Sequence, residues 1–74
     1  ADIPEYRIRC SENGMGWEEI APIYHDEQID TEALYAQACQ RCRAARDWDN
    51  YWVSVILPGQ WLGMSRQCPQ LPAQ

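Results

Sequence analysis

Four cysteines, at positions 10, 39, 42 and 68, constrain this chain of 74 residues more than any other feature. A chain this short buries too little apolar surface to be stable by a wide margin, so domains of this size commonly rely on disulfides or a metal. An even number of cysteines is typical of a disulfide framework in an oxidising compartment and of a zinc site in a reducing one. We therefore expect a single small domain over residues 1–74, whose stability depends on its cysteines.

The longest helical pattern in the chain covers residues 30–56. Its apolar positions recur at intervals of three or four throughout, and Asp30 is well suited to cap the N-terminus. A shorter helix is predicted near residues 16–21, where it stops before Pro22. With an extended N-terminal arm and an irregular C-terminal tail, these elements predict a mainly α fold built on one long central helix.

An α+β fold is the alternative. Residues 6–10 alternate between apolar and polar side chains, as a half-buried strand does. Residues 51–57 are rich in β-branched and aromatic side chains, so they suit a strand if the helix stops near Asp47. In this alternative, short strands occupy residues 6–10 and 51–57.

The spacing of Cys39 and Cys42 predicts how the cysteines pair. Three residues apart on a helix, they lie on nearly the same side, so one can reach back to Cys10 and the other forward to Cys68. The spacing leaves open which of the two takes which partner. Each disulfide would close a long loop and stabilise the fold by on the order of 3 to 4 kcal/mol.

Other uses of the Cys39–Cys42 pair fit the sequence less well. Zinc ribbons supply two CxxC pairs, whereas here the other two cysteines stand alone. The segment LYAQACQRCR, residues 34–43, resembles the haem-attachment stretch of c-type cytochromes, in which two cysteines bind the haem and a following histidine ligates its iron. Arg43 stands where that family has the histidine. We therefore expect no cofactor and no metal.

Charge and hydropathy limit the classes of partner. The formal net charge is −5 and all six basic residues are arginine, so the chain lacks the positive footprint that nucleic-acid binding requires. No apolar run approaches the length of a membrane span. The first residue is Ala rather than Met, which we take as an indication that a signal peptide has been removed. Together with the cysteines, this predicts a secreted or periplasmic protein.

Catalytic side chains are scarce. His25 is the only histidine, and no serine stands in a motif that would activate it as a nucleophile. We therefore do not expect an enzyme.

An acidic segment and surface aromatic residues predict a protein-binding role. The stretch from Ser11 to Glu32 is rich in carboxylates and has no arginine, and every aromatic residue of the chain is Trp or Tyr. We expect a non-enzymatic module of the inhibitor, immunity or accessory-subunit type, which binds a partner protein with a basic surface. A cytoplasmic zinc module with four cysteine ligands and a small glycan-binding domain are the alternatives. The predicted partner-binding residues are Glu18, Glu19, Asp26, Glu27, Trp48, Tyr51 and Trp61.

Overall fold

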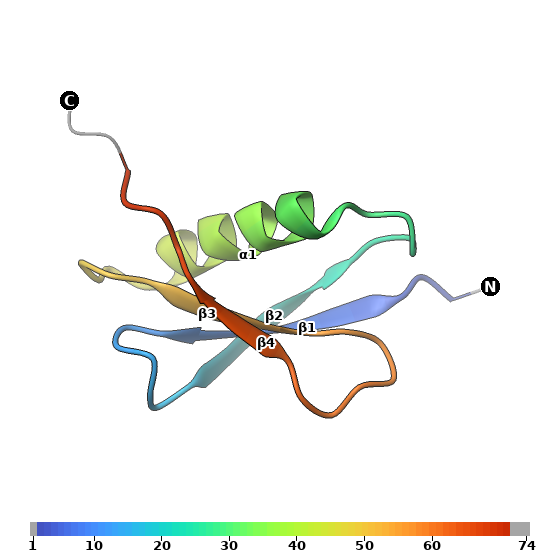
Figure 1. The fold of residues 1–74 in the computed structure, drawn as a ribbon, viewed down its shortest axis with the longest axis horizontal. Helices are drawn as coiled ribbons and strands as arrows, with labels where there is room; N and C mark the ends of the chain where they lie inside the picture. Colours follow the sequence, from blue (N-terminus) through green and yellow to red (C-terminus); the bar gives the residue numbers. More distant parts are fainter. Residues whose placement is uncertain (1, 72–74) are drawn as a thin grey trace.

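The computed structural model describes residues 2–71, which form four strands and one helix. In chain order these are β1 (Glu5–Ser11), β2 (Glu18–Tyr24), α1 (Thr31–Ala45), β3 (Trp52–Ile56) and β4 (Met64–Gln67). The strands build one sheet in the order β2-β1-β3-β4, with every neighbouring pair antiparallel. The helix packs on one face of this sheet (Figure 1). The fold is therefore α+β.

The prediction of a mainly α fold with a helix over residues 30–56 is wrong beyond residue 45. Asp30 caps the helix as expected, accepting a hydrogen bond from the backbone N–H of Glu32, but Arg46 is already extended, at φ −140° and ψ 148°. Asp47 and Asp49 follow, and carboxylates are unfavourable at the negative end of a helix dipole. Beyond them β3 is buried along most of its length. The α+β alternative, with strands near residues 6–10 and 51–57, describes these two segments correctly.

The helix predicted near residues 16–21 is also wrong, because residues 18–21 belong to β2. Ile20 pairs with Ile8 and Ile23 pairs with Tyr6, so β2 has one residue more than β1 between these pairs. Such a bulge turns both isoleucines toward the same face of the sheet, although they are three residues apart. The spacing therefore imitates one side of a helix. Pro22 lies in the bulge of this edge strand, where the sheet tolerates a missing N–H.

The tail predicted to be irregular contains β4. The backbone N–H of Cys68 donates to the carbonyl oxygen of Tyr51 over 2.7 Å, which extends the pairing of β3 with β4 by one residue. At the start of β4, a Cβ atom on Gly63 would lie 2.5 Å from the carbonyl oxygen of Val55. Only glycine allows this close approach, so Gly63 brings the returning chain against β3.

The hydrophobic core lies between α1 and the sheet. Alternate residues of β1 point toward the helix, and Ile8 at the centre is completely buried. The described core consists of Tyr6, Ile8, Cys10, Ile23, Leu34, Tyr35, Ala38, Cys39, Cys42, Val53, Val55 and Cys68.

Two disulfides cross this core, as predicted. Cys10 of β1 pairs with Cys42, and Cys39 pairs with Cys68 just after β4, so the two helical cysteines hold the two ends of the chain. The spacing left open which helical cysteine takes which partner, and the structure pairs the later one, Cys42, with Cys10, so that the two disulfides cross in the sequence. Two disulfides fit an oxidising environment, and no cysteine is free. Within residues 2–71, no helix is long and apolar enough to cross a bilayer.

Candidate functional site

The connection between β3 and β4 and the first residue of β4, Met64, expose large apolar side chains to solvent. Trp61 is 90% exposed, Leu62 87%, Met64 74% and Leu57 49%. We call these four residues the apolar loop. An apolar patch of this kind, grouped on one loop of a small protein, commonly marks an interaction surface.

Local sequence explains the shape of the apolar loop. Pro58 and Gly59 form a tight turn in which the N–H of Gln60 donates to the carbonyl oxygen of Leu57 over 3.0 Å. Gly59 has a φ of +76°, which suits glycine at the third position of a type II turn. The turn residues therefore determine the path of the loop backbone. The exposed apolar side chains are not needed for the turn, so they are available for contacts with another molecule.

A hollow of about 360 Å³ separates the apolar loop from α1, and we call it the loop hollow. Its polar anchor is Tyr35, whose hydroxyl donates to the carbonyl oxygen of Met64 over 3.0 Å and so ties β4 to the helix. Burial raises the pKa of the Tyr35 hydroxyl, which keeps it protonated as a donor. The loop hollow is lined by Thr31, Leu34, Tyr35, Val55, Leu57, Gln60, Leu62 and Met64.

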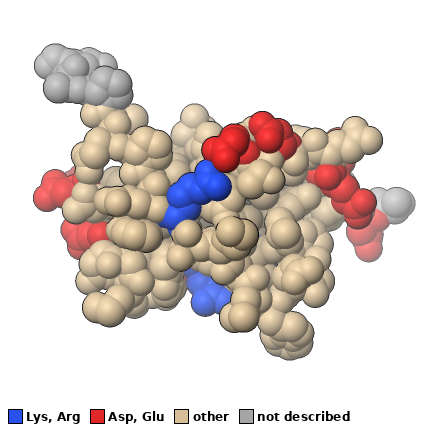
Figure 2. Space-filling model, viewed as in Figure 1, with Lys and Arg blue, Asp and Glu red and all other residues tan. Residues whose placement is uncertain are grey.

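Carboxylates lie beside the apolar loop. Asp26 and Glu27 belong to the connection between β2 and α1, and both are exposed. Glu27 lines a second hollow together with Leu57 and Pro58, so the acidic connection and the apolar loop are neighbours at the same end of the sheet. Figure 2 shows carboxylates at both ends of the visible face and along its upper edge, with basic groups between them.

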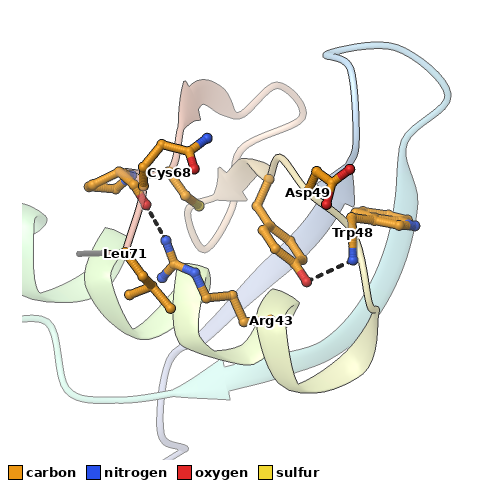
Figure 3. A pocket seen from close by; sticks show the side chains of 8 residues that line it. Arg43, Trp48, Asp49, Cys68 and Leu71 are labelled. Carbon is orange, nitrogen blue, oxygen red and sulfur yellow. Dashed lines mark hydrogen bonds between the residues drawn. The ribbon is translucent and has the colours of Figure 1, made fainter. Parts of the chain in front are cut away.

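Trp48 and Tyr51, predicted to contact a partner, pack against each other at the other end of α1. Both are only partly exposed, their ring centroids are 5.7 Å apart, and the Tyr51 hydroxyl accepts from the backbone N–H of Trp48. They line a hollow of about 280 Å³ beside the C-terminal tail, where the guanidinium of Arg43 donates to the carbonyl oxygen of Pro69 (Figure 3). These contacts hold the tail against the helix.

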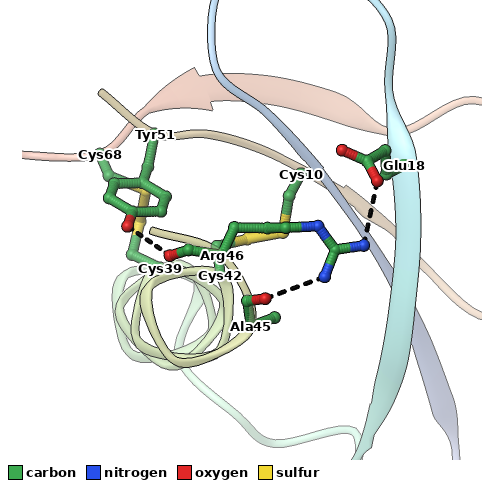
Figure 4. The surroundings of a disulfide bond; sticks show 8 residues. All are labelled: Cys10, Glu18, Cys39, Cys42, Ala45, Arg46, Tyr51 and Cys68. Atoms are coloured by element: carbon green, nitrogen blue, oxygen red, sulfur yellow. Dashed lines mark hydrogen bonds and ion pairs between the residues drawn. A yellow bond between two sulfur atoms is a disulfide. The ribbon is translucent and has the colours of Figure 1, made fainter. Parts of the chain in front are cut away.

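Glu18 and Glu19 are at the start of β2, where arginines already neutralise them. Arg46, just past the helix, reaches over the Cys10–Cys42 disulfide to place its guanidinium 3.0 Å from Glu18 (Figure 4). Arg7 of β1 lies 2.7 Å from Glu19.

The seven predicted partner-binding residues therefore do not share one surface. Glu18 and Glu19 lie at one end of β2, and Asp26 and Glu27 follow its other end. The structure brings Glu27 beside the start of the loop that carries Trp61, because Glu27 lines one hollow with Leu57 and Pro58.

The Arg7–Glu19 pair predicts a dependence on pH. The hydrogen bond from Arg7 lowers the pKa of Glu19 below its ordinary value. A carboxyl whose pKa is lowered by folding stabilises the fold above its unfolded pKa, and this contribution is lost as the pH falls through the folded pKa. We expect Arg7→Gln to move the Glu19 titration upward toward the ordinary value, as measured by carboxyl NMR. An unchanged titration midpoint would show that the pair does not form in solution.

Sequence reasoning missed Leu57, Leu62 and Met64 as site residues. The signal is present, because no charged residue stands between Asp49 and Arg66. That stretch includes a buried strand and an exposed loop, and composition alone does not distinguish them. The exposure of the loop becomes apparent only when β4 is paired with β3.

Comparison with protein-family models, curated proteins and solved structures found no match to this chain.

Proposed function

We propose that this protein is a non-enzymatic, extracytoplasmic protein-binding module, of the inhibitor, immunity or accessory-subunit type, whose partner docks on the apolar loop. The observation that carries the proposal is the exposure of Trp61 and Leu62 on one short connection and of Met64 where the chain enters β4. Large aromatic and aliphatic side chains that lose water on binding are the usual anchors of protein interfaces.

Charge supports a partner with a basic surface. Among the described residues, neither Asp26 nor Glu27 forms an ion pair with an arginine. Glu27 lies beside the apolar loop and Asp26 is its neighbour in the chain, so their carboxylates would orient an approaching basic surface and speed its association. Glu18 and Glu19 are compensated by their arginines and contribute less.

The disulfides support a rigid binding surface and an exported protein. The Cys39–Cys68 disulfide fixes the end of β4 to the helix, and the Tyr35 hydroxyl holds Met64 at its start. The strand that follows the apolar loop is therefore anchored at both ends, so less ordering entropy is lost on binding. Disulfides persist in secreted and periplasmic proteins, and we place the protein there. The same bonds occupy all four sulfurs that the zinc-module alternative would need as thiolate ligands.

A substitution in the apolar loop tests the proposal. The immobilised chain is used to capture partners from the extracytoplasmic fraction of its source cells, and the captured protein is then titrated by calorimetry. Trp61→Ser is expected to weaken binding by about thirtyfold or more, because it removes a central apolar anchor. Met15→Ser is the matched control, since Met15 is 71% exposed on the connection at the other end of β1. Equal affinity of wild type and Trp61→Ser for every captured protein would contradict the proposal.

The charge prediction compares two matched double substitutions. Asp26→Asn with Glu27→Gln is expected to slow association about threefold to tenfold at low salt and to reduce its dependence on salt. Glu18→Gln with Glu19→Gln removes the same charge from the carboxylates that arginines already neutralise, so its effect is expected to be smaller. If the second pair slowed association more than the first, the basic surface of the partner would have to face the start of β2 instead.

A further inference from the structure

The two edge strands of the sheet are not equally protected against a further strand. β2 forms one edge and is blocked: Pro22 has no N–H, the strand is bulged there, and Arg41 donates to the Pro22 carbonyl oxygen over 3.1 Å. Proline, bulges and charged side chains are the usual means by which proteins prevent pairing at an edge. β4 forms the other edge; it is short and carries the charged Arg66, but its sequence MSRQ contains no proline and its pairing with β3 has no bulge.

The ladder between β3 and β4 shows which backbone groups of this edge point outward. The hydrogen bond from the Cys68 N–H to the Tyr51 carbonyl oxygen makes these residues a hydrogen-bonded pair. Such pairs alternate along an antiparallel ladder, so Met64 and Arg66 also point their backbone groups toward β3. Ser65 and Gln67 then point theirs away from the sheet. Among the hydrogen bonds within residues 2–71, no side chain satisfies these outward groups.

There is open space beside this edge on the side of α1. The loop hollow lies next to Met64. Another hollow, of about 390 Å³, lies next to Arg66 and Gln67, between β4, the helix and the tail, and we call it the edge hollow. Side chains of an added strand would alternate in direction, so those opposite Met64 and Arg66 would enter the two hollows in turn.

The charges beside the edge hollow indicate which kind of side chain should enter it. The guanidinium of Arg66 lies 4.1 Å from the Tyr35 ring centroid and 2.9 Å from a carboxylate oxygen of Glu32. Arg43 lines the same hollow, and within the described part of the chain it has no carboxylate partner. A carboxylate there would be complementary, whereas β4 of a second copy would bring none, because Arg66 is the only charged residue of its sequence MSRQ.

We propose that β4 is the docking edge for an extended segment of the partner, which adds antiparallel to β4 with an apolar side chain opposite Met64 and a carboxylate opposite Arg66. The backbone groups of Ser65 and Gln67 supply the hydrogen bonds, and the two hollows select the side chains. This inference rests on the proposed function, because it specifies how part of the same partner binds.

A synthetic peptide tests the edge without the partner. The probe is acetylated and amidated Thr-Thr-Glu-Thr-Val-Thr-Thr, titrated into the isotope-labelled protein by NMR. We expect the largest amide shifts at Ser65 and Gln67, and binding about twofold to fivefold weaker when lysine replaces the glutamate. Shifts absent from β4, or equal binding of the two peptides, would overturn the inference.

Two substitutions of Ser65 distinguish the contribution of its backbone N–H to peptide binding from that of its side chain. Ser65→Pro removes an N–H that points away from the sheet, so the fold should persist and the peptide should bind at least about fivefold more weakly. Ser65→Ala keeps the N–H and should bind as wild type does. The inference would be overturned if folded Ser65→Pro bound the peptide with unchanged affinity. It would also be overturned if the free wild-type chain sedimented as a dimer and Ser65→Pro dissociated that dimer. The capture experiment with Trp61→Ser tests the apolar loop alone, so a failure of the docking edge can be distinguished from a failure of the proposed function.

Discussion

Reduction of both disulfides is expected to unfold the protein at room temperature. Cys10–Cys42 spans 32 residues and Cys39–Cys68 spans 29, and loops of that length correspond to about 3 to 4 kcal/mol of stabilisation each. The net stability of a domain of this size is only about 4 to 11 kcal/mol. Losing both bonds therefore removes most or all of it. Far-UV circular dichroism with and without reductant should show the loss of both helix and sheet.

Two alanine pairs resolve the contribution of each disulfide. Cys10→Ala with Cys42→Ala, and Cys39→Ala with Cys68→Ala, avoid placing a hydroxyl in the core. Each is expected to lower the melting temperature by roughly 15 to 25 °C. The second pair should also release β4 from the helix, which hydrogen exchange at β4 would detect. A fully reduced chain that melted within a few degrees of the oxidised one would show that the core is sufficient without the disulfides.

Ile8→Ala is expected to be the most damaging single substitution in the core, costing about 2 to 5 kcal/mol. Ile8 is 0% exposed and lies on β1, one of the two central strands, where it pairs with Ile20 on one side and Val55 on the other. Truncation leaves a cavity under α1 that neighbours on two strands cannot fill without shifting the sheet. The midpoint of unfolding in guanidinium chloride, at unchanged slope, measures the loss.

Ile3→Ala is the matched control for this substitution. Ile3 has the same side chain but is 64% exposed, so its truncation should change stability by less than about 0.5 kcal/mol. A loss for Ile8→Ala no larger than that for Ile3→Ala would contradict the position of Ile8 in the core.

The sequence predicted local features of the fold better than the extent of each element. The Asp30 cap, the strand-like alternation of β1 and the use of Cys39 and Cys42 to hold both chain ends were all readable, because each depends on a few neighbouring residues. The end of the helix was not, since apolar spacing continues beyond Ala45 into β3. A helix and a strand that are both buried can share that spacing over a short stretch.

The candidate site was predictable only in part. Trp61 and the acidic residues Asp26 and Glu27 were found from residue type, which indicates what a side chain can bind. Trp48 and Tyr51 were expected on a partly exposed patch by the same criterion, and both are partly exposed, but the structure places them beside the C-terminal tail, away from Trp61. Residue type does not reveal whether another segment of the chain lies against a side chain.

By itself, the sequence determined the cap of the helix, the alternation of β1 and a cysteine spacing that allows two bonds from one side of a helix. These depend on contacts within a turn or a strand, so they are encoded locally. Only the tertiary structure decided which cysteines pair, that β2 is a bulged strand, and that β4 returns to form an open edge beside an exposed apolar loop. Each of these is decided by pairing between segments far apart in the chain. Their free energy depends on what lies opposite, which local spacing does not specify.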